Sequence, residues 1–225
     1  MTVSKLFLNG CSFLTPRPKD GVDTHYGVEL ATLMDLKIAT NLAMGGRGNE
    51  RISFTTKLWF EQNGYKDIFA MIGWSSMMRN DYVTNDGWKK GRMPNMDLTW
   101  RSWKLTENTD FIKKQTGWDL ENTLIMKYLD NVLDLQNYFK LHKIPYVMCN
   151  SLPNYSNPNI SDFKTFSKAT DMERFFKPEQ SHLEFIQEGN YVVSPKDPHP
   201  SAIGHKLWAK ELKEFIDVNN LCTVE

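Results

Sequence analysis

The sequence has little cysteine and no cluster of metal-binding side chains. Its three cysteines, Cys11, Cys149 and Cys222, are too few and too scattered to form a disulfide framework. It contains no Cys-x-x-Cys pair and no closely spaced set of cysteines and histidines, so the pattern predicts no zinc site. We expect reduced thiols, no metal and no organic cofactor.

An excess of charge and long apolar runs are missing as well. The 27 basic and 27 acidic residues leave no net field that would attract nucleic acid or an anionic membrane. The first apolar stretch, from Leu6 to Leu8, is broken by Asn9 and Gly10, which excludes a signal peptide or a membrane span there. We therefore expect a protein that stays in a cytosol or joins a particle assembled there.

The length and the hydrophobic pattern predict one α/β domain over residues 1–225. Short apolar runs predict strands at 5–9, 37–42, 67–72, 144–149 and 191–193. Helical spacing of apolar residues predicts helices at 26–34, 52–60, 124–135 and 203–216, the last with Ser201 as its N-cap. This alternation favours a three-layer α/β/α sandwich with a flavodoxin-like parallel sheet.

Two segments interrupt the alternation, at about 82–120 and 153–190. Both are polar and irregular, and the first is rich in tryptophan. We interpret them as insertions that form a rim or lid over the strand ends. An assembly surface is an equal alternative for the first.

Chemically useful residues follow the first three predicted strands and precede the last helix. In open parallel sheets the ligand crevice lies beyond the carboxyl ends of the strands, so these four loops should meet there. Their sequences are Gly10-Cys-Ser-Phe13, Asn41-Leu-Ala-Met-Gly-Gly-Arg-Gly-Asn49, Gly73-Trp-Ser-Ser76 and Asp197-Pro-His-Pro-Ser-Ala-Ile-Gly-His205. This ordered set resembles the SGNH (GDSL-like) hydrolase superfamily, and the Gly-Cys-Ser-Phe opening resembles its phage-encoded members.

The resemblance implies roles for individual residues. Ser12 is the expected nucleophile, and His199 is the base that Asp197 orients. The backbone N–H groups of Ser12 and Gly46 are the expected oxyanion donors. The implied fold is that of SGNH hydrolases, and the implied reaction is hydrolysis of an acyl ester through an acyl-Ser12 intermediate.

Three positions depart from the family pattern. Cys11 stands where the GDSL name has aspartate, and a small buried side chain is the favoured interpretation because nothing basic adjoins it. Ser75 stands where the family usually has an oxyanion-hole asparagine, so we expect either a weaker third donor there or help from nearby Asn49 at the oxyanion hole. The acid lies two residues before the histidine instead of three.

The two-residue spacing is compatible with an acid–base pair. Asp197 and His199 each precede a proline, which favours an extended backbone. Side chains two residues apart in an extended segment point to the same face, with Cα atoms roughly 6.5 to 7 Å apart. A carboxylate can then reach the nearer imidazole nitrogen and hold the tautomer whose other nitrogen faces Ser12.

Further residues are candidates for substrate contact or for structure. Trp74, Arg79, Trp88, Trp100 and Trp103 could line the substrate site, although large aromatic residues also pack irregular insertions. The segment from Gly45 to Gly48 lacks the Gly-Lys-Ser/Thr ending of a phosphate loop, so nucleotide binding is not expected. His205 is expected to support the start of the last helix.

The sequence therefore predicts a serine esterase acting on a small-molecule or glycan ester, with short acyl groups, such as acetyl on a carbohydrate, implied by the resemblance. Two alternatives stay open. An O-acyltransferase would use the same residues, and a catalytically silent module could bind glycans or assemble with other proteins.

Overall fold

The computed structural model describes residues 3–84, 99–104, 120–154, 164 and 168–223. The strands are β1 (Lys5–Gly10), β2 (Lys37–Asn41), β3 (Ile68–Trp74), β4 (Arg79–Thr84), β5 (Thr99–Lys104), β6 (Tyr146–Asn150), β7 (Phe175–Phe176), β8 (Val192–Ser194) and β9 (Asp197–Pro200). The α-helices are α1 (Tyr26–Leu33), α2 (Asn49–Asn63), α4 (Leu120–Leu141), α6 (His182–Glu188) and α7 (Ala202–Val218). Short 3-10 helices are η1 (Ser12–Leu14), η2 (Pro18–Asp20) and η4 (Met172–Arg174).

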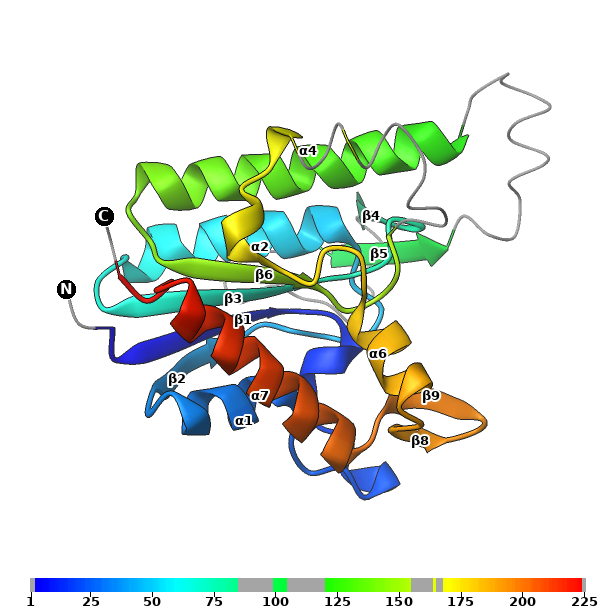
Figure 1. Ribbon diagram of the computed structural model, residues 1–225. Coiled ribbons are helices and arrows are strands. Elements are labelled where there is room, and N and C mark those ends of the chain that lie inside the picture. Colours follow the sequence, from blue (N-terminus) through cyan, green and yellow to red (C-terminus); the bar gives the residue numbers. More distant parts are fainter. Residues whose placement is uncertain (1–2, 85–98, 105–119, 155–163, 165–167, 224–225) are drawn as a thin grey trace.

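Five parallel strands form the central sheet in the order β2-β1-β3-β6-β7. This is the order of a flavodoxin-like sheet. Helices α2 and α4 cover one face, and α1 and α7 cover the other (Figure 1). The predicted three-layer α/β/α architecture is confirmed.

The central strands are buried on both faces, which explains why their sequences are continuous apolar runs. In β3, Ala70, Ile72 and Trp74 face the core beneath α2 and α4. Phe69 and Met71 face the core beneath α1 and α7. Alternate side chains of one strand therefore pack against the two helical layers on opposite faces of the sheet.

The strand ends lie close together where β1 meets β3. Gly10 pairs with Gly73, and a Cβ atom added at Gly10 would lie 2.8 Å from the carbonyl oxygen of Gly73. A side chain at Gly73 would meet the Tyr26 hydroxyl at 2.5 Å. These glycines allow the loops that follow the two strands to start side by side.

The two irregular segments contain more regular structure than the sequence predicted. The antiparallel hairpin β4–β5 begins before position 82 and includes 99–104, while residues 85–98 and 105–119 lie outside the described residues. The second segment contributes β7, which completes the sheet, and helix α6. The expected short strand near 191–193 is β8, which pairs with β9 and not with the central sheet.

Among the described residues, no helix is both long and apolar enough to cross a membrane.

Candidate active site

Four loops at the carboxyl end of the sheet carry the candidate residues. Ser12 begins η1 directly after β1, and the Met44–Gly48 segment connects β2 to α2. Ser75 follows β3, which is the neighbour of β1 on the side opposite β2. Connections leaving β1 to either side produce the kind of crevice in which α/β sheets bind ligands.

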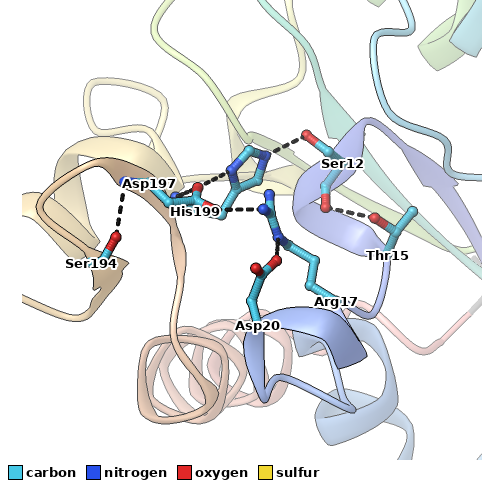
Figure 2. Close-up of polar contacts among 7 residues, drawn as sticks. All are labelled: Ser12, Thr15, Arg17, Asp20, Ser194, Asp197 and His199. Atoms are coloured by element: carbon cyan, nitrogen blue, oxygen red, sulfur yellow. Dashed lines mark hydrogen bonds and ion pairs between the residues drawn. The ribbon is translucent and has the colours of Figure 1, made fainter.

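The side chains of Ser12, His199 and Asp197 form one continuous hydrogen-bonded chain (Figure 2). The Ser12 Oγ lies 3.0 Å from His199 Nε2, although the residues are 187 positions apart. The His199 Nδ1 lies 2.6 Å from Asp197 Oδ1. When Nδ1 carries the ring proton and hydrogen-bonds through it to the carboxylate, Nε2 has a free lone pair. It can then accept a hydrogen bond from the Ser12 hydroxyl and, during the reaction, its proton.

Strand β9 explains why the two-residue spacing works. Asp197 and His199 lie on an extended strand, so both side chains leave it on the same face. The His199 backbone N–H also donates to Asp197 Oδ1 at 3.1 Å. At the other end of the turn, the Asp197 N–H donates to Ser194 Oγ at 3.1 Å, which fixes the backbone that carries the acid.

Arg17 is a site residue that the sequence did not reveal. Its Nη2 donates to Asp197 Oδ2, and its Nε donates to Asp20 Oδ2 at 2.8 Å (Figure 2). It belongs to none of the four loops and lies 180 residues before Asp197, so no local signal could have identified it.

The Asp197 carboxyl is held in its charged form. Partial burial raises its pKa, but hydrogen bonds from the side chain and backbone of His199, and the charges of His199 and Arg17, outweigh burial. The pKa of Asp197 is therefore below its ordinary value. A charged carboxylate at this position can stabilise an imidazolium on His199.

The loop that carries the predicted oxyanion residue Gly46 passes close to Ser12. Gly46 has a φ of +80°, a conformation that favours glycine, and a Cβ atom built at Gly45 would lie 3.8 Å from the Cβ of Ser12. The loop thus approaches Ser12 at Gly45, next to the predicted donor.

Asn49 and Ser75 are joined to each other. The Ser75 N–H donates to Asn49 Oδ1 at 2.8 Å, and Asn49 Nδ2 donates to the Ser75 carbonyl at 3.0 Å. Both residues are buried. Asn49 therefore fixes the backbone of Ser75, and one of its two amide hydrogens is already used.

The hydroxyl of Ser75 has an arginine partner. Arg79 Nη1 donates to Ser75 Oγ at 3.0 Å. This bond occupies a lone pair of the oxygen and leaves the hydroxyl proton free for another acceptor. Arg79, a candidate for substrate contact, is thus bound to a predicted oxyanion residue.

Buried polar contacts hold the loop after β2. Asn9 Nδ2 donates to the Ile52 carbonyl at 3.1 Å, and Arg47 Nη1 donates to Asn9 Oδ1 at 3.2 Å. The pKa of Arg47 is lowered to about 10 by burial and then by the charge of Arg51, while Asp81 opposes the shift. Arg47 is still a cation at neutral pH, and the Asp81 carboxylate, which accepts from the Gly48 N–H at 2.8 Å, lies beside the same loop.

The tryptophans predicted to contact substrate divide into two groups. Trp74 is fully buried and packs edge-to-face against Tyr128 at 6.2 Å in the core beneath α2 and α4. Its ring has no exposed face, so this part of the prediction needs correction. Trp88 lies outside the described residues, and Trp100 and Trp103 lie on β5 with their side chains outside the described part.

Three histidines lie buried behind the site. His182 stacks on Trp208 at 4.6 Å and meets the edge of Tyr26, while His205 lies 5.6 Å from His182. Burial lowers the pKa of His25 to about 4 and contributes most to lowering that of His205 to about 3. These rings are neutral at physiological pH. In the described part of the chain, no group of three or more His, Cys, Asp or Glu is arranged to hold a metal ion.

Comparisons with known proteins find structural similarity without sequence similarity. No protein-family model matches the sequence, and no curated protein matches it significantly. The psychrotrophic esterase EstA from Pseudoalteromonas sp. aligns with 96% of this chain and 97% of its own, with a TM-score of 0.52 and 11% identity.

Two other solved structures give lower scores. A carbohydrate esterase family 2 enzyme from Corynascus thermopiles (Myceliophthora fergusii) has a TM-score of 0.49 at 13% identity, covering 96% of this chain and 66% of that chain. The acetylxylan esterase Axe2 from Geobacillus stearothermophilus has a TM-score of 0.48 at 13% identity, covering 96% and 94%. At 11% identity, the similarity to EstA shows that this chain shares the α/β fold of an esterase.

Proposed function

We propose that the protein is an SGNH-type serine ester hydrolase in which Ser12 is the nucleophile. The observation that supports this most strongly is the chain of contacts from Ser12 Oγ through the His199 ring to Asp197. A serine hydroxyl is a weak nucleophile until an adjacent base takes its proton, and His199 Nε2 lies at hydrogen-bond distance from it.

The proposed reaction has two balanced halves. Ser12 Oγ attacks the acyl carbon while its proton passes to His199 Nε2, and the imidazolium then gives that proton to the departing alcohol oxygen. In the second half, water attacks the acyl-Ser12 ester, loses a proton to Nε2, and releases the acid with Ser12 reprotonated. Asp197 stays charged throughout and stabilises each imidazolium.

Charge that develops on the ester oxygen requires preorganised donors. We assign these to the backbone N–H groups of Ser12 and Gly46, and to the hydroxyl of Ser75, which is fully buried and must become accessible to the substrate oxygen for this role. Asn49 supports Ser75 by hydrogen bonds to its backbone N–H and carbonyl groups. The proposed substrate carries a short acyl group, such as acetyl on a carbohydrate, because that is what the SGNH resemblance implies.

A fluorophosphonate probe tests the nucleophile directly. We expect the wild-type protein to be labelled covalently, and we expect Ser12→Ala and His199→Ala to lose the label while they stay folded. The EstA structure is described as inhibited by monoethylphosphonate, and phosphonates therefore suit this test. Labelling that persists in Ser12→Ala would exclude Ser12 as the nucleophile.

Steady-state assays then separate the activities. The wild-type protein should hydrolyse p-nitrophenyl acetate with a burst of p-nitrophenol as the acyl-enzyme accumulates. Product analysis with added sugar separates a hydrolase, which releases acetate, from an acyltransferase, which acetylates the sugar.

The departure at Ser75 favours a second candidate, a catalytically silent module that binds glycans or assembles with other proteins. Equal background rates for wild type and Ser12→Ala, together with no labelling, would support this second candidate.

A further inference from the structure

Arg17 lies in a short loop whose backbone is fixed. The Arg17 N–H donates to the Val22 carbonyl at 2.6 Å, and the Val22 N–H donates back to the Arg17 carbonyl at 3.1 Å. Helix η2 lies between them, and its Asp20 accepts from Arg17 Nε. The guanidinium is thereby held on one side by its own loop, and its Nη2 is directed at Asp197 (Figure 2).

Among the described contacts, the other hydrogen bonds of Asp197 all come from its own hairpin, so its side chain needs a partner outside the hairpin. Asp197 lies on the small β8–β9 hairpin outside the central sheet, and its side chain is 24% exposed. Its Oδ1 receives both N–H groups of His199, but those bonds come from the same short strand. Within the described part of the chain, only the bond from Arg17 to Oδ2 connects the carboxylate to the segment that carries Ser12.

We propose that Arg17 is a positioning residue: its guanidinium holds Asp197 Oδ2 so that Oδ1 stays on His199, and it connects the hairpin of the acid and base to the loop of the nucleophile. This inference rests on the proposed hydrolase function. It also gives a physical reason why an acid only two residues from its histidine can be held in place, since the orientation is fixed from a separate part of the chain.

The charge of Arg17 and its orientation of Asp197 have opposite effects on proton transfer to His199. The cation of Arg17 lies near the ring that must become an imidazolium, and that repulsion disfavours the proton transfer. Among the described residues, Asp20 shares the Arg17 guanidinium with Asp197, and His205 lies close enough to His199 to interact with it electrostatically. His205 is neutral at physiological pH because its pKa is about 3. Because the pair is partly exposed, solvent weakens the repulsion, and the gain in orientation is the larger effect.

Two substitutions separate charge from geometry. In Arg17→Gln, kcat/KM for p-nitrophenyl acetate should fall by about tenfold to a hundredfold, mostly in kcat, because the acid and base lose their alignment. The acid limb of its pH profile should move to higher pH, because the charge of Arg17 helps to hold the pKa of Asp197 below its ordinary value and this charge is gone. Arg17→Lys keeps the charge but loses the planar guanidinium that bonds Asp20 and Asp197 at the same time. We therefore expect kcat to fall while the acid limb stays in place.

Lys213→Gln is the matched control. It also removes one cation from an ion pair, the one with Asp217 on the surface of α7, and should leave both kcat and the pH profile unchanged. A folded Arg17→Gln variant with wild-type kcat and an unmoved acid limb would overturn the inference.

A double-mutant cycle shows whether Arg17 acts through Asp197. If it does, Arg17→Gln should change kcat by less than about twofold in an Asp197→Ala background, because no carboxylate is left to position. Equal fold-losses in both backgrounds would show an independent effect and would contradict the proposal.

One readout does not depend on turnover. The proton between His199 Nδ1 and Asp197 should give a downfield NMR resonance that is absent in His199→Ala. Arg17→Gln should broaden or lose it, and retention at wild-type sharpness would overturn the positioning role. A wild-type protein that shows this resonance but neither cleaves esters nor reacts with fluorophosphonate would disprove the proposed function separately.

Discussion

At the scale of single residues, the hydroxyl of Ser75 is the least usual part of the proposed site. It stands where SGNH hydrolases usually have an amide, and it accepts a hydrogen bond from Arg79 at 3.0 Å. A cationic donor on the oxygen polarises the hydroxyl and favours donation of its proton. Arg79 and Ser75 together could therefore supply part of what an asparagine would supply.

We expect Ser75→Ala to lower kcat by about tenfold to a hundredfold with little change in KM. The loss should be smaller than for a full oxyanion donor, because a serine hydroxyl reaches less far than an amide, and KM should hold because the bond forms mainly in the transition state. Steady-state kinetics with p-nitrophenyl acetate checks this.

Ser76→Ala is the neighbouring control, since its hydroxyl accepts only from the backbone N–H of Met78 among the described contacts. An unchanged kcat in Ser75→Ala would remove Ser75 from the oxyanion site.

At the scale of elements, helix α7 fixes the strand that carries the base. The Ser201 Oγ accepts from the Gly204 N–H at 3.3 Å and donates to the Tyr191 carbonyl at 2.7 Å. The Ser201 N–H donates to the same carbonyl at 2.8 Å. One residue therefore caps the helix and closes the β8–β9 hairpin two positions after His199.

Ser201→Ala should lower the free energy of unfolding by about 1 kcal/mol, which corresponds to a melting temperature about 2 to 4 °C lower for a chain of this size. It should also lower kcat, because the hairpin that positions His199 loses one of its two bonds to the Tyr191 carbonyl. Calorimetry and ester hydrolysis measure the two effects.

Ser181→Ala is the comparison for this prediction. Ser181 caps α6 in a capping box with Glu184, so Ser181→Ala should lower the free energy of unfolding by a similar amount. Because Ser181 makes no described bond to the hairpin, the kcat of this variant should stay at the wild-type value. Loss of activity in proportion to loss of stability in both variants would show that the cap of α7 has no special role.

At the scale of the whole molecule, the buried histidines connect stability to pH. In the folded protein the pKa of His25 is about 4 and that of His205 about 3, and burial also lowers the pKa of His182 well below its ordinary value. The pKa of a histidine in the unfolded chain is about 6.5. At pH values between the folded-state and unfolded-state pKa, the unfolded chain binds more protons than the folded protein, so the free energy of unfolding rises with pH.

We therefore expect the free energy of unfolding to fall as the pH drops below about 6.5, by up to about 1.4 kcal/mol per pH unit for each histidine. The window extends to about pH 4 for His25 and about pH 3 for His205. Glu50 opposes the trend because burial raises its pKa. Urea unfolding at a series of pH values measures the slope.

His205→Asn should reduce the dependence of the unfolding free energy on pH by the contribution of one histidine. His142→Asn, at a partly exposed histidine outside the cluster, is the control. A slope that His205→Asn leaves unchanged would contradict the linkage.

The outcome of the sequence predictions follows from how local each signal is. Strands β1, β3 and β6 were predictable because burial on both faces produces continuous apolar runs. Strand β7 has two residues, Phe175 and Phe176, and two residues carry no periodicity. Trp74 was a candidate for substrate contact, although it shares the alternation of Ala70 and Ile72, which indicated the core.

The sequence by itself determined the alternation of strands and helices, the glycines at the strand ends and the extended Asp197-Pro-His199-Pro segment. All of these depend on hydrophobic periodicity and backbone restrictions within a few residues. Only the tertiary structure decided that Ser12 meets His199 across 187 positions and that Arg17 binds Asp197. Such contacts arise from the packing of the β8–β9 hairpin against the N-terminal loop, and no local pattern encodes them.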